Sequence, residues 1–267
     1  MAVTDDLQTT IDIGGMAIRL CADNADFLQM LRQRYAGFVK DDAAPHYEFK
    51  VDLNPTGKTA EDEDLLVHRD GTKWLLTRGD FQAEWCEQDK LGRIRQSANP
   101  YSVDAVLRLV HSLVLAQQGG FLLHGAGAIR NGRAFLFSGV STAGKTTISR
   151  LAPQDVTLLT DEISYIRRDG SGYVGFGTPF SGELEKAGPN VSAPIGALFL
   201  LGKGPDNRIE PMEKSDAVKR ILRNVLFFAQ DPMLVGAIMQ SVRDFVERVP
   251  VSKLVFYPDQ RVWELIR

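Results

Sequence analysis

The chain has 267 residues, 44% of them hydrophobic and 24% charged, and a formal net charge of −3 at pH 7. These values are typical of a soluble globular protein and disfavour a nucleic-acid partner. The acidic start has neither the basic segment nor the apolar run of a secretion signal, and the longest apolar tract, residues 103–116, is too short to span a bilayer. Because Cys21 and Cys86 match no disulfide or metal pattern, we expect a cytoplasmic protein without a membrane partner.

Residues 1–100 are predicted to form an accessory subdomain that is rich in β-strands, mainly antiparallel, with one early helix. A Gly14–Gly15 turn indicates a hairpin near the start, and Asn24 is a candidate N-cap for the helix that follows. Alternating polar and apolar residues then predict four strands joined by turns, at 47–53, 65–69, 72–77 and 81–86.

Residues 101–267 are predicted to form a second domain of mixed α/β type. Helical spacing over 103–118 is followed by two apolar runs, 121–129 and 134–140, and the Asn131–Gly132 dipeptide between them predicts an antiparallel hairpin. The pattern then predicts a short helix and a series of strands and helices. The helices are expected at 145–152, 215–228 and 232–247, and the strands at 156–162, 163–168, 196–203, 253–257 and 262–266.

A glycine-rich segment follows the hairpin with the pattern Gly139-x-x-x-x-Gly144-Lys145-Thr146. In a P-loop, glycines let backbone N–H groups converge on phosphate oxygens, a lysine reaches the outer phosphates, and a hydroxyl binds magnesium. The alternative is a glycine-rich turn with an exposed lysine. The predicted phosphate-binding residues are Gly139, Ser141, Thr142, Ala143, Gly144, Lys145, Thr146 and Thr147, with Thr146 also a metal ligand.

Two acidic residues, Asp161 and Glu162, end the strand that comes next in the chain. Carboxylates at the carboxyl end of a strand beside a P-loop are placed to bind magnesium or to accept a proton from a hydroxyl group. The alternative is an ordinary turn at the end of a strand. We predict that both carboxylates are catalytic and bind the metal.

His124 is a further candidate because of the predicted hairpin register. If Arg130 lies opposite Arg133, paired positions sum to 263, so His124 would lie opposite Gly139 at the start of the glycine segment. An imidazole there can bind a phosphate or orient a carboxylate, whereas a structural histidine at a strand end is the alternative. The antiparallel hairpin also differs from the parallel βαβ unit of typical P-loop nucleotidases.

The motifs "LLHGAG", "GVSTAGKTT" and "LLTDE", followed by "GTPFSGE", resemble the HPr kinase/phosphorylase family, which shares its core with ATP-type phosphoenolpyruvate carboxykinases. The resemblance covers roughly residues 103–267. It implies an α/β (α+β) fold with a mixed-sheet P-loop core, ATP and Mg2+ as cofactors, and a possible homo-oligomer. It further implies that Lys145 binds the triphosphate, Asp161 is the base, Glu162 is the second acid and His124 assists at the phosphate.

The chain departs from the family in its Val-Ser-Thr-Ala loop, in an Asp-Glu pair instead of Asp-Asp, and in lacking the arginine-glycine signature. These differences point away from HPr as the acceptor. We therefore expect a kinase that transfers the γ-phosphoryl group of ATP to a hydroxyl, serine-type, of a peptide, protein or small molecule. An inactive nucleotide-binding regulator is the alternative, and decarboxylation is a weaker third. Glu183 and Arg208 are secondary candidates for the site.

Overall fold

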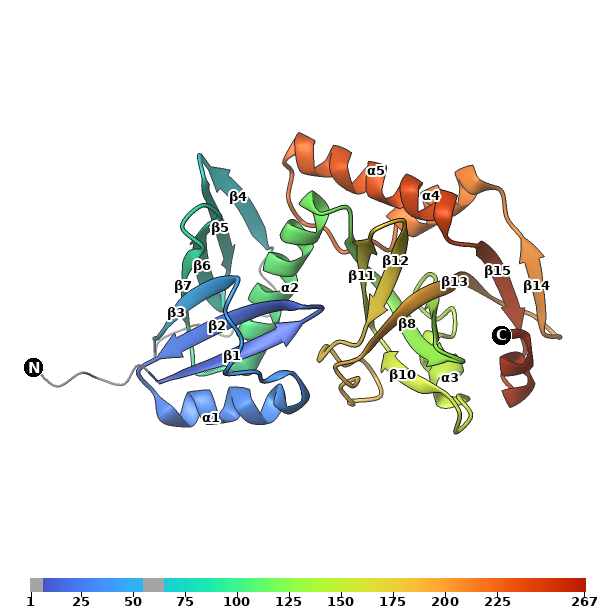
Figure 1. The fold of residues 1–267 in the computed structure, drawn as a ribbon, viewed down its shortest axis with the longest axis horizontal. Coiled ribbons are helices and arrows are strands. Elements are labelled where there is room, and N and C mark those ends of the chain that lie inside the picture. Colours follow the sequence, from blue (N-terminus) through green and yellow to red (C-terminus); the bar gives the residue numbers. More distant parts are fainter. Residues whose placement is uncertain (1–6, 55–64) are drawn as a thin grey trace, which may run out of the picture. The chain divides into compact units, whose positions relative to one another are not determined.

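The structure is a computed structural model that describes residues 7–54 and 65–267 (Figure 1). It forms two compact units, and the chain passes from the first to the second within helix α2 (Pro100–Gln117). The first unit holds the described residues up to Val110 together with Phe228–Asp231, and the second holds His111–Phe227 and Pro232–Arg267. Each unit is built on a mixed β-sheet, which confirms the predicted α/β class. None of the helices in the described residues is long and apolar enough to cross a lipid bilayer.

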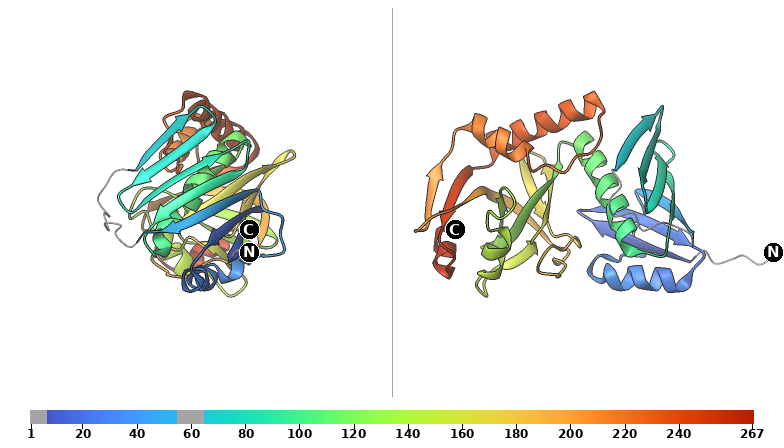
Figure 2. Two further views of the ribbon diagram at one scale, coloured as in Figure 1. Left: turned by 90° about the vertical axis from the view of Figure 1, so that its left-hand side faces the viewer. Right: turned by 180° about the vertical axis from the view of Figure 1, so that it is seen from behind.

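The first unit is a seven-stranded sheet in the order β1-β2-β3-β7-β6-β5-β4, seen face-on in the left view of Figure 2. Strand β3 runs parallel to β2 and to β7, and the remaining neighbours are antiparallel. Its strands are β1 (Gln8–Ile13), β2 (Met16–Ala22), β3 (Tyr47–Leu53), β4 (Leu66–Asp70), β5 (Lys73–Arg78), β6 (Phe81–Cys86) and β7 (Leu91–Gln96).

Helix α1 (Ala25–Arg34) packs on β1 and β2, and it begins at the predicted cap, where the side chain of Asn24 accepts a hydrogen bond from Phe27 N. The short 3-10 helix η1 (Ala36–Phe38) follows it. The buried rings of Trp74 and Trp85 stack in the core of this unit with centroids 5.9 Å apart. This unit is therefore a regular sheet with a conventional apolar core.

The second unit contains eight strands. The long strand β8 (Phe121–Arg130) pairs with β11 through its first half and with β9 through its second half. Strand β13 is parallel to both β9 and β15, which makes the sheet mixed. The other strands are β9 (Arg133–Ser138), β10 (Thr157–Thr160), β11 (Ile163–Asp169), β12 (Gly172–Phe176), β13 (Ser192–Lys203), β14 (Arg208–Pro211) and β15 (Val251–Phe256).

The β8–β9 hairpin has the predicted register, since Arg130 pairs with Arg133 and Ala126 with Phe137. The ladder ends at the pair Gly125–Ser138, because β9 stops there. The predicted pair between His124 and residue 139 is therefore not formed, and His124 instead pairs with Ile163 of β11.

Two other predictions for this unit need correction. Helix α4 (Lys214–Leu222) ends earlier than predicted because the next residues extend along β8, where Leu226 N donates to Leu122 O. The predicted strand 262–266 is instead the 3-10 helix η2 (Gln260–Leu265). Asp259 is its N-cap, and the Asp259 side chain accepts a hydrogen bond from Arg261 N. Val262 and Trp263 are buried in the core, and Leu265 is partly buried against it. Helix α5 (Pro232–Arg248) agrees closely with its prediction and packs on β8 and β12.

Candidate functional site

The glycine loop, residues 139–144, connects β9 to helix α3 (Lys145–Arg150). Its backbone is unusual, since Thr142 has φ 67° and Gly144 has φ 109°. Residues other than glycine rarely adopt positive φ, and such strain is found most often at functional sites. The tip is open to solvent, with Val140 73% exposed and both Ser141 and Thr142 exposed. The loop thus presents an exposed, strained backbone at the end of a buried strand.

Both glycines of the loop are required by close packing. A Cβ at Gly144 would lie 2.6 Å from the ring of Phe256, and a Cβ at Gly139 would lie 2.9 Å from the Cβ of Ala143. Ala143 is itself buried, and its N–H donates to the carbonyl of Val140. The spacing of the two glycines therefore matches two places where the chain cannot accommodate a side chain.

Lys145 begins helix α3 and is only 8% exposed. Its ammonium group donates to the carbonyls of Gly139 (3.2 Å) and Val140 (3.4 Å), so the side chain folds back over the glycine loop. Thr146 and Thr147 follow in the first turn of the helix and are half-buried. The predicted lysine and hydroxyl groups are therefore adjacent to the exposed loop backbone.

His124 lies on β8 and is half-buried. Its backbone is held on two sides, because its N–H donates to Asn224 O (2.7 Å) and its carbonyl accepts from the Ser138 hydroxyl (2.8 Å). Burial and the positive charge of Lys145 both lower the pKa of His124. The imidazole is thus within electrostatic range of the glycine-loop lysine.

Asp161 follows β10 and is 6% exposed. Its two carboxylate oxygens accept hydrogen bonds from the backbone N–H groups of Gly182 (2.9 Å) and Leu184 (2.8 Å). We call the segment 182–184 the amide clamp. A Cβ at Gly182 would lie 3.1 Å from both the Asp161 Oδ2 atom and the Glu162 Cβ atom, so a larger residue there would press on the acidic pair. The clamp fixes the direction in which the Asp161 carboxylate points.

Carboxylates influence Lys145 from two segments of the chain. Burial lowers the pKa of Lys145, while the negative charges of Glu162 and Glu183 act in the opposite direction. Glu183 is the middle residue of the amide clamp, and its exposed side chain lies 3.9 Å from the guanidinium of Arg150. Lys145, His124, Glu162 and Glu183 therefore share one electrostatic environment.

Of the predicted site residues, Arg208 is not connected to the group around Lys145 by any contact described above. Arg208 lies on the edge strand β14, where the carboxylates of Asp206 and Glu210 engage its guanidinium. The amide clamp is the part that sequence reasoning did not derive from the residues. Its only sequence signal is the "GTPFSGE" segment. The two hydrogen bonds come from backbone N–H groups 21 and 23 residues after Asp161, and backbone groups do not depend on the type of residue.

The predicted metal ligands Thr146, Asp161 and Glu162 carry hydroxyl and carboxylate oxygens, the ligand type that magnesium takes. Within residues 7–54 and 65–267, no three His, Cys, Asp or Glu side chains gather into a group that could hold a metal ion. Magnesium bound with a nucleotide needs no such group, because it takes one or two carboxylates and completes its shell with water and phosphate oxygens. The chemistry of these side chains is therefore that of a nucleotide-bound magnesium site.

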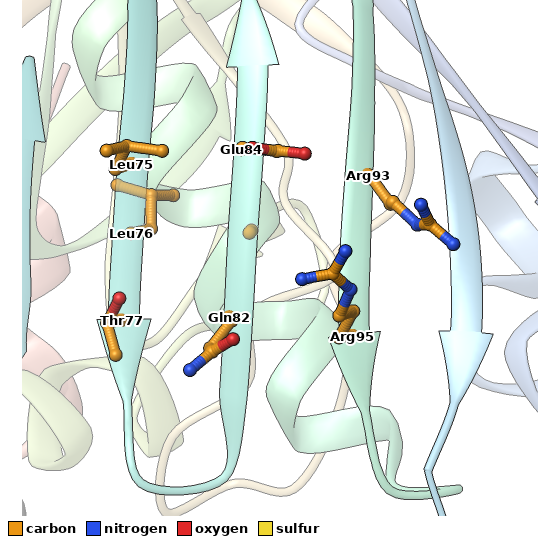
Figure 3. Close-up of a pocket in the computed structure, with 8 residues that line it drawn as sticks. Leu75, Leu76, Thr77, Gln82, Glu84, Arg93 and Arg95 are labelled. Atoms are coloured by element: carbon orange, nitrogen blue, oxygen red, sulfur yellow. The ribbon is translucent and has the colours of Figure 1, made fainter. Parts of the chain in front are cut away.

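The first unit has a shallow depression of about 220 Å3 on the solvent face of its sheet (Figure 3). Strands β5, β6 and β7 line it, and the Arg95 side chain reaches toward β6. Arg93 at its edge is paired with Asp52. None of the predicted site residues contributes to this depression, whose lining residues are Leu75, Leu76, Thr77, Gln82, Ala83, Glu84, Arg93 and Arg95.

Comparison with known proteins places the larger part of the chain in a family. Residues 85–265 match the model of the SynChlorMet cassette protein ScmC. The chain belongs to the ScmC family. The matched range of this ScmC family member includes the glycine loop, both acidic residues, His124 and the amide clamp.

The other comparisons add little to the family assignment. No curated protein matches the chain. Among solved structures, the Hpr(Ser) kinase/phosphatase from Coxiella burnetii matches with 12% identity over 46% of this chain and 88% of that chain, with a TM-score of 0.24. The site of this ScmC family member is therefore interpreted from its own geometry.

Proposed function

We propose that the chain is an ATP-dependent kinase that transfers the γ-phosphoryl group to a hydroxyl, serine-type, of a peptide, protein or small-molecule acceptor. The observation that carries the proposal is the arrangement around Lys145. The lysine, an imidazole and two carboxylates share one electrostatic environment beside an exposed glycine loop, and a clamped aspartate adjoins one of those carboxylates. Phosphoryl transfer requires little more than charge neutralisation, positioning and a proton acceptor.

The glycine loop would bind the triphosphate through its backbone N–H groups, with Ser141 and Thr142 at its open side. Lys145 would leave the loop carbonyls that it now contacts and bind the outer phosphates instead. This exchange is favourable, since an ammonium group binds a phosphate anion more strongly than it binds neutral carbonyls. Burial of Lys145 strengthens the attraction because water screens it less.

Thr146, Asp161 and Glu162 would hold magnesium together with phosphate oxygens. When bound, the ion would neutralise charge that develops on the transferred phosphoryl group. Each carboxylate oxygen of Asp161 accepts one backbone hydrogen bond and has a second lone pair. The amide clamp therefore leaves Asp161 able to bind a magnesium ion.

Asp161 would also act as the base. The acceptor oxygen attacks the γ-phosphorus, the bond between that phosphorus and the bridging oxygen of ADP breaks, and the hydroxyl proton passes to the Asp161 carboxylate. The amide clamp contributes by orienting the carboxylate through a hydrogen bond to each of its oxygens. His124, whose pKa in the free protein is lowered by burial and by Lys145, would donate a hydrogen bond to a phosphate oxygen.

One observation favours the alternative, a nucleotide-binding regulator without turnover. Asp161 is 6% exposed and both of its oxygens are already engaged, which is also expected of a carboxylate that only holds a loop in place. In that case nucleotide binding would remain, and phosphoryl transfer would be absent.

The test uses ATP labelled in its γ-phosphate and a panel of acceptors, which comprises serine-containing peptides, free hydroxy amino acids and proteins. We expect the wild type to form labelled product with at least one acceptor. Asp161→Ala should abolish product while it still binds the nucleotide through the glycine loop and Lys145. A wild type that binds Mg-ATP and labels nothing would favour the regulator. Equal loss of binding and transfer in Asp161→Ala would contradict the role as base.

A further inference from the structure

The helix that follows the glycine loop is too short to be stable by itself. Helix α3 has six residues, and its N-cap, Gly144, supplies no side chain to satisfy the first N–H groups. Helices of this length gain their stability from packing against other parts of the protein. The position of Lys145 and Thr146 in the first turn therefore depends on the elements that support α3.

Trp263 of η2 provides one such support. Its indole N–H donates to the carbonyl of Ile148 in α3 (3.2 Å), and its ring meets Phe137 of β9 edge-on with centroids 5.4 Å apart. Trp263 is 2% exposed and Ile148 is fully buried. One side chain thus contacts the strand before the glycine loop and the helix after it.

Phe256 provides a second support from the end of β15. Its ring occupies the space where a side chain at Gly144 would lie, and this glycine has the left-handed φ at which the loop turns into α3. The phenylalanine is 3% exposed, and its backbone pairs with Lys203 of β13. The last turn of the glycine loop therefore rests on an aromatic ring that the sheet holds in place.

Arg130 of β8 fastens the C-terminal segment to the sheet. Its guanidinium donates to the backbone carbonyls of Trp263 and Ile266, and to the Asp155 carboxylate (2.8 Å). These bonds hold two carbonyls at the C-terminal end of η2, and the carbonyl of Trp263 also accepts a hydrogen bond from Ile266 N (3.2 Å). The segment is thus fixed both to the hairpin and to α3.

We propose that the C-terminal segment 256–266 is a positioning element for the glycine loop, and that Trp263 is a positioning residue for nucleotide binding. The inference rests on the proposed function, because the bound group is the triphosphate. Trp263 acts through α3, since its indole fixes the helix that carries Lys145 and Thr146. Without this contact, Lys145 and the backbone amides of the glycine loop would occupy several alternative positions. The affinity of the loop for the triphosphate would therefore fall.

The main variant is Trp263→Phe, which removes the indole N–H and retains an aromatic ring. Trp85→Phe is the matched control, since Trp85 is 1% exposed, lies in the first unit and has an indole nitrogen without a hydrogen-bond partner among the described residues. Calorimetry should give a Kd for Mg-ATP about five- to tenfold higher in Trp263→Phe, the factor that follows from losing one hydrogen bond. The Kd of Trp85→Phe should stay within about twofold of the wild type.

A second readout is independent of nucleotide. Amide hydrogen exchange of the free protein should become faster in residues 139–150 of Trp263→Phe and stay unchanged there in Trp85→Phe. If Trp263→Phe does not fold, Arg130→Lys is used instead, because a single ammonium group cannot hold Asp155 and both carbonyls as the two guanidinium nitrogens do. The same results are expected for this variant. A variant with wild-type exchange and wild-type Kd would overturn the proposal.

The two readouts also separate this inference from the proposed function. If the wild type binds no Mg-ATP, the proposed function fails, and exchange alone decides whether the segment positions the loop. If the wild type binds and only the exchange result is negative, the proposed function stands and the positioning role is wrong.

Discussion

The two sides of the candidate site are built in different ways. On one side, the glycine loop and Lys145 are consecutive in sequence, and the lysine contacts carbonyls five and six residues away. On the other side, Asp161 is held by backbone amides 21 and 23 residues further along the chain. A local motif thus forms the phosphate side, whereas the acidic side depends on backbone amides from a distant part of the chain.

This contrast teaches which substitutions should affect binding and which should affect transfer. Changes to the glycine loop act on a strained backbone that packs against Phe256, and they should reduce nucleotide affinity. Changes to the amide clamp act on the direction of one carboxylate, and they should reduce turnover. Substitutions on each side of the site therefore test that division.

Gly144→Ala should have the largest effect. The new Cβ would meet the Phe256 ring at 2.6 Å, and the backbone has φ 109°. We expect about 3 kcal/mol of destabilisation from strain and overpacking together, with loss of Mg-ATP binding. Gly170→Ala is the control, because its φ of 53° is also positive but no atom lies within 4 Å of the new Cβ, and it should cost about 1 kcal/mol. Equal unfolding free energies in denaturant titrations would contradict this account.

Substitutions at the amide clamp should separate turnover from binding. Asp161→Asn turns an acceptor oxygen into an NH2 group that faces a backbone N–H, so it should destabilise the fold by about 2 kcal/mol and abolish transfer. Gly182→Ala retains the carboxylate but displaces it, because its Cβ would lie 3.1 Å from Oδ2. This variant should lower kcat about tenfold and leave the Kd for Mg-ATP within about twofold. A rise in Kd as large as the fall in kcat would show that the two sides are not separable.

His124 should make nucleotide binding depend on pH. Burial and Lys145 lower its pKa in the free protein, and a bound triphosphate would raise it. Between these two pKa values binding takes up a proton, so affinity should increase as the pH falls through that interval and level off below the pKa of the free protein. Calorimetry in two buffers of different ionisation enthalpy measures the uptake. His124→Asn should remove it, and unchanged uptake in this variant would assign the proton to another group.

Glu183→Gln should have the smallest effect. Its carboxylate lies near Lys145 and is 73% exposed, so it weakly opposes a bound triphosphate. Removing the charge should strengthen Mg-ATP binding about twofold at low salt, and less at high salt, because solvent screens exposed charges. Glu185→Gln, an exposed neighbour in the same loop, should change the Kd less. A higher Kd for Mg-ATP in Glu183→Gln would indicate that this carboxylate helps to bind magnesium instead.

The sequence predicted the parts of the structure that local patterns encode. The Asn131–Gly132 turn fixed the register of the β8–β9 hairpin, and Asn24 marked the start of α1. Residues 262–266 were wrongly predicted as a strand, because the same apolar residues can be buried either in a sheet or, as here, in a 3-10 helix beneath α3. The length of α4 was also wrong, since pairing of residues 224–226 with β8 is a long-range effect.

In the candidate site, too, the features set by local sequence were predictable and those set by long-range contacts were not. The residues of the glycine loop follow from their spacing alone, while the early end of β9 at Ser138, which changes the partner of His124, depends on where the strand leaves the sheet. The amide clamp involves backbone N–H groups, which every residue except proline carries. No pattern of side chains could have indicated it.

The most direct test of the central claim is calorimetric titration of Mg-ATP into the wild type and into Lys145→Ala, with ADP and pyrophosphate as comparison ligands. Lys219→Ala, an exposed lysine of α4, is the control and should bind like the wild type. We predict magnesium-dependent binding that is weakened at least about thirtyfold in Lys145→Ala, the loss expected for a charge-assisted contact to phosphate. A folded wild type that binds none of these ligands, or an equal Kd in Lys145→Ala, would contradict the assignment of the glycine loop as a phosphate site.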